Sequence, residues 1–181
     1  MFKKLFGITL TVGTLLLSSC ASISKDECRA GDWERIGYKD SSSGHDSSRL
    51  GSHIEECGKV GVQIDKNLYT KGYQDGLKIY CTYDKGLEVG RDGGFYRDIC
   101  PGDLAREFRR GYQLGQQINK IEDQVTAIET EIQNLENTLA KEAIAYERRR
   151  IASEISTKRA LVTTLRTQIT ILESQSMGRR Y

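Results

Sequence analysis

The chain has 181 residues, and its 27 Lys and Arg stand against 25 Asp and Glu, which gives a formal charge of +2. This near balance excludes the strongly basic composition of nucleic-acid-binding proteins, so we expect no nucleic acid as a partner. Hydrophobic residues make up 38% of the chain, and one Pro and five Cys are present.

Residues 1–19 have the pattern of a secretory signal peptide. Lys3 and Lys4 precede an apolar run that is too short for a membrane-spanning helix. Leu17-Ser18-Ser19-Cys20 closes the run and resembles the lipobox of bacterial lipoproteins, in which the thiol receives diacylglycerol and the chain is cleaved before it. We therefore expect residues 20–27 to be a lipidated Cys20 and a short tether. The alternative is a plain cleavage site with an incidental cysteine.

The residue after Cys20 bears on the destination of the lipoprotein. Ala21 stands there rather than Asp, and by resemblance to lipoproteins of Gram-negative bacteria this implies the outer membrane, facing the periplasm. Several acyl chains, palmitate among them, hold such a protein durably, because each buried CH₂ contributes about 0.8 kcal/mol. Cleavage also removes Lys3 and Lys4 and leaves 25 cations against 25 anions.

Four cysteines remain in the secreted chain: Cys28, Cys57, Cys81 and Cys100. Secretion places them in an oxidising compartment, where they are expected to form two disulfides. Four thiols allow three pairings, and the spacing alone does not choose among them.

Residues 28–116 are predicted to form a small helical module. Apolar residues recur at helical spacing in 28–38, 48–58 and 65–81, whereas residues 40–44 are turn formers and 84–94 are too rich in Gly for a helix. We therefore interpret Gly86, Gly90, Gly93 and Gly94 as turn residues.

A faint repeat marks close-packing positions in this module. Gly37-Tyr38, Gly72-Tyr73 and Gly111-Tyr112 repeat along the chain, and a second small residue follows each Gly after four positions: Ser41, Gly76 and Gly115. A Gly inside a helix costs about 1 kcal/mol relative to Ala, so such pairs need compensating contacts that a larger residue would forbid. We predict close backbone approach at Gly37, Gly72, Gly76, Gly111 and Gly115.

The order of these residues across positions 26–116 resembles a family of small proteobacterial lipoproteins, domain of unknown function 2799. One departure is Ser41, which follows Asp40 where the family usually has Gly. The resemblance implies no activity. It rests on Cys28, Trp33, Gly37-Tyr38, Asp40, Gly44, His53, Cys57, Gly61, Asp65, Tyr69, Gly72, Gly76-Leu77, Tyr80-Cys81, Gly86, Gly90, Gly93, Tyr96 and Cys100-Pro101.

A helical hairpin formed by the first two helices favours one pairing of the cysteines. It brings Cys28, at the start of one helix, close to Cys57, at the end of the other, while Cys81 and Cys100 bracket a single Gly-rich excursion. Each loop closure stabilises the fold by roughly 3 to 4 kcal/mol in the entropic description. A module with so few aliphatic side chains needs such cross-links.

Residues 117–178 are predicted to be a coiled-coil arm, with Asp103 as the N-cap of the helix that leads into it. Apolar residues recur at steps of three and four in two stretches that are out of register. Either the chain bends back between Lys141 and Arg149 as a hairpin, or one long helix pairs with another molecule. The two stretches are Ile118, Ile121, Val125, Ile128, Ile132, Leu135, Leu139 and Ile151, Ile155, Lys158, Val162, Leu165, Ile169, Leu172.

Candidate chemical groups in the chain have simpler structural interpretations. His53 and Cys57 have the spacing of zinc ligands on a helix, but Cys57 is expected to be oxidised, so we predict no metal. Serines 41–43 near His45 read as a turn rather than a nucleophile with its base. We interpret the scattered carboxylates, Asp40 among them, as helix caps and turn residues. The sequence therefore predicts no catalytic residue and no cofactor.

The sequence therefore predicts a mainly α protein: a disulfide-stapled, Gly/Tyr-rich helical module followed by a long coiled-coil helix or helical hairpin. We expect a non-enzymatic outer-membrane lipoprotein that contacts the membrane through its anchor and itself or a protein partner through the arm. The alternative is a peptidoglycan-binding or envelope-enzyme accessory protein with exposed aromatic residues as its binding surface: Trp33, Tyr69, Tyr73, Tyr80, Tyr83 and Tyr96.

Overall fold

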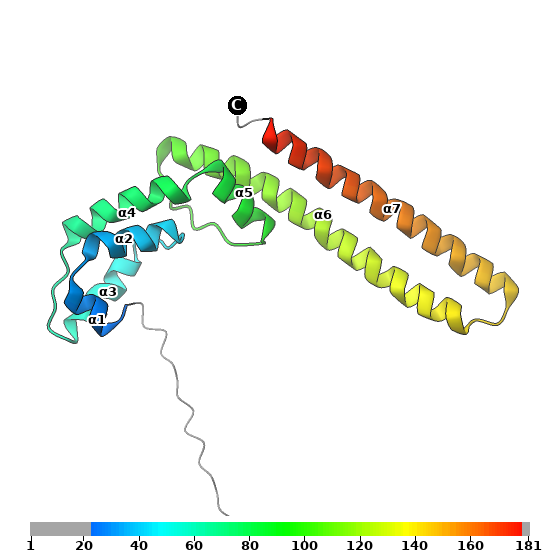
Figure 1. The fold of residues 1–181 in the computed structure, drawn as a ribbon, viewed down its shortest axis with the longest axis horizontal. Coiled ribbons are helices and arrows are strands. Elements are labelled where there is room, and N and C mark those ends of the chain that lie inside the picture. Colours follow the sequence, from blue (N-terminus) through cyan, green and yellow to red (C-terminus); the bar gives the residue numbers. More distant parts are fainter. Residues whose placement is uncertain (1–22, 179–181) are drawn as a thin grey trace, which may run out of the picture.

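The computed structural model describes residues 23–178, which are helical without any strand (Figure 1). The predicted signal peptide and Cys20 lie outside the described residues. Within 23–178, none of the helices combines the length and apolar character needed to cross a bilayer. The helices are α1 (Lys25–Ala30), α2 (Trp33–Ser42), α3 (Arg49–Gly58), α4 (Lys66–Tyr80), α5 (Tyr83–Arg91), α6 (Gly102–Lys141) and α7 (Ala145–Met177).

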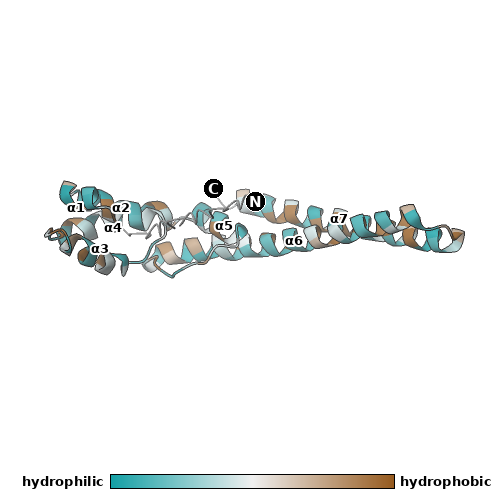
Figure 2. Cartoon of the chain, turned by 90° about the horizontal axis from the view of Figure 1, so that it is seen from below, coloured by the Kyte–Doolittle hydropathy of each residue, from teal (hydrophilic) through white to brown (hydrophobic). Residues whose placement is uncertain are grey.

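Two hydrophobic cores lie one after the other along an elongated molecule (Figures 1 and 2). The first is built from α1 to α5 and the start of α6, and it includes the fully buried Phe108. The second runs between α6 and α7. Because α6 contributes to both cores as one continuous helix, the predicted boundary between residues 116 and 117 lies inside a helix.

Side-chain caps start most helices of the module. Asp32, Asp65 and Thr82 each accept a hydrogen bond from a backbone N–H of the first turn that follows, and Ser24 forms a capping box with Glu27. The predicted cap at Asp103 is wrong, because α6 begins at Gly102 after Pro101 and has no side-chain cap.

The prediction of a turn at residues 40–44 is wrong for residues 40–42, because α2 continues through Ser42. The buried Ser41 hydroxyl donates to the carbonyl oxygen of Gly37, 3.1 Å away, so its hydrogen-bond donor has a partner within the helix. The chain turns only at Gly44, which has a φ of 79°.

The first core is organised by a crossing of α2 and α4 in which the backbones touch. A Cβ built on Gly37 would overlap the carbonyl oxygen of Tyr69, and one built on Gly72 would overlap that of Glu34. One turn further along, a Cβ on Gly76 would overlap the Ser41 hydroxyl. Small residues on both helices therefore permit a contact that any other side chain would prevent.

The crossing of α5 and α6 repeats this contact. A Cβ on Gly86 would overlap the carbonyl oxygen of Phe108, and one on Gly111 would overlap that of Tyr83. Gly90 and Gly115 meet the opposite backbone in the same way one turn later. The interpretation of Gly86 and Gly90 as turn residues is thus wrong, because both lie on the packed face of α5.

Even the hydrogen bonds at the ends of the two crossings correspond. The Tyr73 hydroxyl donates to the carbonyl oxygen of His45 at 2.8 Å, and the Tyr112 hydroxyl donates to that of Gly94 at 3.0 Å. Each tyrosine directly follows a contact glycine, and each acceptor lies beyond the end of the opposite helix. The three sequence echoes are therefore part of two equivalent helix pairs.

The disulfides join Cys28 to Cys57 and Cys81 to Cys100, the pairing that the sequence favoured. Their Cα atoms lie 5.4 and 5.6 Å apart. The first bond connects α1 to α3, and the second connects the end of α4 to the segment before α6. However, α2 packs mainly against α4 rather than against the next helix in sequence.

The arm is an antiparallel hairpin of α6 and α7 within one chain. Both predicted apolar stretches contribute to its core, where Val125, Ile132, Ile151, Ile155 and Val162 are buried. Ion pairs link the two helices beside this core, including Lys158 to Glu131 at 2.6 Å and Arg166 to Glu129 at 2.6 Å.

The hairpin turns within residues 142–144 without Gly, Pro or Asn. The Arg148 guanidinium closes it by donating to the carbonyl oxygens of Leu139 and Glu142, at 2.8 and 2.9 Å. The Glu142 carboxylate in turn accepts from the N–H of Ile144. Side chains therefore supply the hydrogen bonds that a turn residue usually provides.

The helix crossing makes Gly72 a sharp test of stability. Gly72→Ala should lower the free energy of unfolding by at least about 2 kcal/mol, because the new methyl group forces α2 and α4 apart. Gly51→Ala on α3 is the matched control: a Cβ there meets nothing within 4 Å, so stability should rise by up to about 1 kcal/mol. Urea unfolding measures both, and equal effects would contradict the backbone contact.

Candidate functional site

A buried polar cluster joins α2, α3 and α4 in the first core. The Asp40 carboxylate accepts a hydrogen bond from the Tyr69 hydroxyl at 2.8 Å, and its same oxygen lies 2.7 Å from Nε2 of His53. Its other oxygen lies 3.1 Å from Nε of Arg49. Asp40, His53 and Tyr69 are each 5% exposed or less.

The ionised form of Asp40 is stabilised by these neighbours. Burial by itself would raise the pKa of the carboxyl group, but the hydrogen bonds from His53 and Tyr69 and the charge of Arg49 outweigh it, so that the pKa is lowered. Burial and the hydrogen bond to Asp40 raise the pKa of Tyr69, which therefore stays protonated. The cluster thus holds one carboxylate charge between two hydrogen-bonding side chains and one cation.

The crossing of α5 and α6 has other side chains at the positions that correspond to this cluster. Asp40 lies three residues after Gly37, and Val89 lies three residues after Gly86; Tyr69 and Phe108 correspond in the same way. The apolar Val89 and Phe108 pack in the first core without a charge. Since α5 and α6 cross equally closely, the crossing itself does not need the polar cluster. What it adds is the attachment of α3, through Arg49 and His53.

The cluster resembles an aspartate–histidine pair of a hydrolase only in part. Such a site needs a nucleophile within reach of the histidine and access for substrate. The nearby Ser41 hydroxyl donates instead to the carbonyl oxygen of Gly37 and is fully buried. The His53 ring is 1% exposed. The groups that would do chemistry are thus used in packing.

No three His, Cys, Asp or Glu side chains within residues 23–178 are placed to hold a metal ion. The zinc ligands considered from sequence have other partners, because Cys57 is in a disulfide and His53 contacts Asp40.

The aromatic residues that the alternative function needs at the surface lie mostly inside. Tyr69, Tyr73, Tyr80 and Trp33 are all at most 9% exposed. Tyr80 stacks on the fully buried Phe108, with ring centroids 5.1 Å apart. These rings form part of the core, so they are not available at the surface to stack on a sugar.

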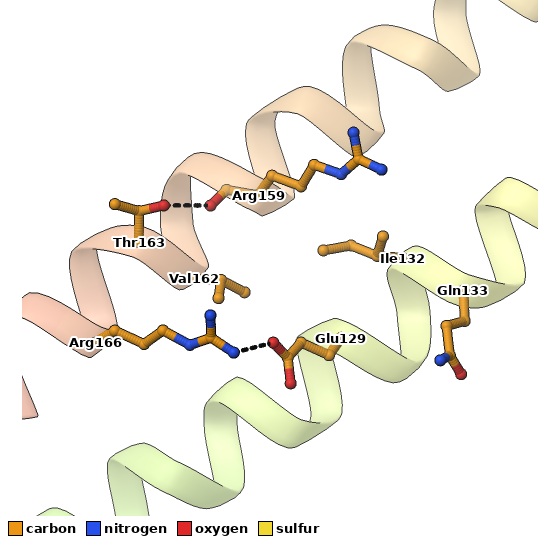
Figure 3. Close-up of a pocket in the computed structure, with 7 residues that line it drawn as sticks. All are labelled: Glu129, Ile132, Gln133, Arg159, Val162, Thr163 and Arg166. Carbon is orange, nitrogen blue, oxygen red and sulfur yellow. Dashed lines mark hydrogen bonds and ion pairs between the residues drawn. The ribbon is translucent and has the colours of Figure 1, made fainter.

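A groove of about 420 Å³ lies along the arm between α6 and α7 (Figure 3). Its floor is formed by Ile132 and Val162, which belong to the arm core, and the ion pair between Glu129 and Arg166 spans it. Since these apolar side chains already pack against each other, the groove is the ordinary flank of a two-helix hairpin.

Two features escaped the sequence analysis. Arg91 links three helices, because its guanidinium binds Glu122 of α6 and Glu173 of α7. The contact role of Gly86 and Gly90 was also missed, although their spacing of four equals that of Gly72 and Gly76. That spacing was the sequence signal for the two glycines. Nothing in the sequence indicates the partners of Arg91, because they are distant in the chain.

The lowered pKa of Asp40 predicts a pH-dependent stability. Its contribution is fully present above the pKa of the unfolded carboxyl group, near 4, and is lost as pH falls through the lower folded value. At neutral pH, Asp40→Asn should cost about 3 kcal/mol, because it breaks a buried charge cluster. The difference from wild type should shrink below about pH 4.

Urea unfolding at a series of pH values checks this prediction. Asp26→Asn, at an exposed carboxylate of α1, is the control and should change stability by less than about 0.5 kcal/mol throughout. A difference between Asp40→Asn and wild type that persists unchanged into acid would contradict the assigned role of the Asp40 charge.

The comparisons with known proteins concern the module. The model of the family described as "Protein of unknown function (DUF2799)" matches residues 32–117. No curated protein and no solved structure matches the chain. The matched range runs from the cap of α2 to the part of α6 that crosses α5, and so contains both glycine crossings. The resemblance carried by the cysteines and glycines is therefore confirmed, and residues 32–117 match the DUF2799 family.

Proposed function

We propose that this protein is a lipid-anchored, non-enzymatic spacer of the outer membrane that faces the periplasm and presents its arm to a partner. The lipobox-like Leu17-Ser18-Ser19-Cys20 supports the anchor, and Ala21 supports the outer membrane. The two disulfides are in keeping with an oxidising compartment.

The observation that carries the proposal is the continuity of α6. Its 40 residues extend over about 60 Å, with the first turns in the module and the last at the far end of the arm. No loop interrupts the path between them, so the arm has a fixed direction relative to the module (Figure 1). A rigid arm of this kind suits a protein that holds a contact point away from its attachment.

The junction of module and arm is tied by polar contacts around Arg91. Its Nε lies 3.1 Å and its Nη1 2.9 Å from carboxylate oxygens of Glu122 and Glu173, and its carbonyl oxygen accepts from Asn119 at 2.7 Å. The end of α7 is thereby held to α5 as well as to α6. These contacts support a spacer whose parts move together.

The way the chain uses its polar and apolar groups supports an interaction role over catalysis. Asp40, His53 and Tyr69 satisfy one another inside the core. Most apolar side chains of the two stretches pack against each other within one chain, so pairing with a second molecule is not needed to form this core. We therefore place the contact with a partner on the outer face or the tip of the arm.

The anchor is tested at Cys20. In a Gram-negative host, wild-type protein should sediment with the outer membrane, and mass spectrometry should find acyl chains on an N-terminal Cys20. Cys20→Ala should leave an unprocessed precursor without acylation. Cys81→Ala, which removes a cysteine of the module and breaks its disulfide with Cys100, is the control and should keep the lipid. An unacylated wild-type Cys20, or cleavage at another residue, would contradict the anchor.

The rigid junction is tested by Arg91→Met, which keeps much of the side-chain length but removes both ion pairs. Partly exposed ion pairs contribute up to about 1 kcal/mol each, so amide hydrogen exchange in residues 169–177 should become about tenfold faster. Arg110→Met, which removes only a pair within α6, should leave it unchanged. Equal exchange in Arg91→Met and wild type would show that the junction does not depend on Arg91.

A further inference from the structure

The tip of the arm, residues 141–150, exposes apolar side chains that the fold does not use. Ile144 is 62% and Tyr146 66% exposed, and neither belongs to the arm core. Ala143 and Ala145, which alternate with them, are exposed as well. The outermost end of the hairpin is therefore a short uncharged segment in contact with solvent.

Turn formation does not account for these residues. Arg148 and Glu142 supply the side-chain hydrogen bonds that close the turn, and Ile144 takes part only through its backbone, whose N–H donates to Glu142 and whose carbonyl oxygen accepts from the N–H of Arg148. Small polar residues such as Asn, Asp or Ser are the usual choice in such a solvated turn. The side chains of Ile144 and Tyr146 thus have no role within the described part of the chain.

Cations surround the uncharged segment. Residues 141–150 hold four cations and two carboxylates, although the mature chain as a whole is balanced. Lys141 and Arg149 are exposed and form no ion pair within residues 23–178, whereas Arg150 pairs with Glu147 at 2.8 Å. A shallow groove of about 510 Å³ continues along α7 beside Tyr146, Arg149 and Arg150.

We propose that the arm tip docks on the surface of an anionic phospholipid membrane. An aliphatic side chain and a tyrosine enter the interface, and Lys141 and Arg149 contact the lipid phosphates. Among polyanions, a membrane is favoured because a glycan or nucleic-acid backbone offers nothing apolar to the exposed Ile144. The overall charge balance gave no sign of this contact, because the cations are concentrated at one end.

The place of the tip makes this contact separate from the anchor. The tip lies at the opposite end of the molecule from residue 23, where the described chain begins (Figure 1). Two cations and two apolar side chains give only weak, reversible binding by themselves. The proposal does not depend on lipidation of Cys20; if the anchor is present as well, the protein has two attachment points.

The test places an indole at the tip of the full-length chain through Tyr146→Trp, in a Trp33→Phe background so that no other indole is present. The chain is mixed with vesicles of brominated phosphatidylcholine, with or without phosphatidylglycerol. We expect quenching by the brominated tails in the anionic vesicles, and weaker quenching at high salt. Any attachment through residues 1–22 is the same in all variants and does not report on the tip.

Two further changes in this background test the chemistry. Lys141→Gln with Arg149→Gln should weaken tip binding roughly 25-fold, since each cation near an anionic surface contributes about fivefold. Ile144→Ser should also weaken tip binding, because an apolar contact with the membrane interface is lost. Lys66→Gln with Lys120→Gln removes equal charge from exposed positions in α4 and α6, away from the tip, and should leave quenching unchanged.

The outcomes are distinct. Absent quenching, equal quenching on neutral vesicles, or an equal loss in the Lys66 and Lys120 control would overturn the proposal, as would tip binding to purified cell-wall glycan in place of vesicles. The changed side chains at the tip and in the control are exposed, and Trp33→Phe keeps an aromatic ring at the buried position 33, so we expect all variants to fold, which circular dichroism checks. Cys20→Ala should retain tip quenching, so failure of the anchor and failure of the tip contact are separable.

Discussion

Direct contact between helix backbones is the constraint on which this structure depends. At two crossings, glycines on one helix lie against carbonyl oxygens of the other, and a methyl group at any of these positions would force the helices apart. Such contact brings Cα–H groups close to carbonyl oxygens, which offsets the intrinsic cost of glycine in a helix. Together with two disulfides, it lets a module with few aliphatic side chains hold a defined arrangement.

The second crossing also determines where the arm points. Gly111 and Gly115 seat α6 against α5, and the same helix continues without a break into the hairpin. Arg91, at the end of α5, then reaches Glu122 and Glu173 and holds both arm helices. The glycine contacts, though confined to the module, therefore set the orientation of a tip that is several tens of ångströms away.

The two crossings share a backbone arrangement but fill it differently. Val89 and Phe108 occupy the positions that correspond to Asp40 and Tyr69. An apolar pair is sufficient where Phe108 packs on other aromatic rings, such as that of Tyr80, whereas the charged cluster appears where α3 is attached. A buried charge is costly unless several donors surround it, so the cluster specifies the position of α3 more than it adds stability.

The sequence by itself determined the helical class, the two apolar stretches of the arm and the five packing glycines, because each follows from local periodicity or spacing. It also favoured the observed cysteine pairing, but through an expected hairpin of the first two helices, whereas α2 packs mainly against α4. It misjudged residues 40–42 and 84–91, since local turn propensity argued against helices that tertiary contact stabilises. Only the tertiary structure decided that α2 pairs with α4, that Asp40 meets His53 and Tyr69, and that the arm folds back on itself. These contacts join residues distant in the chain, and a single sequence holds no signal for which distant surfaces will meet.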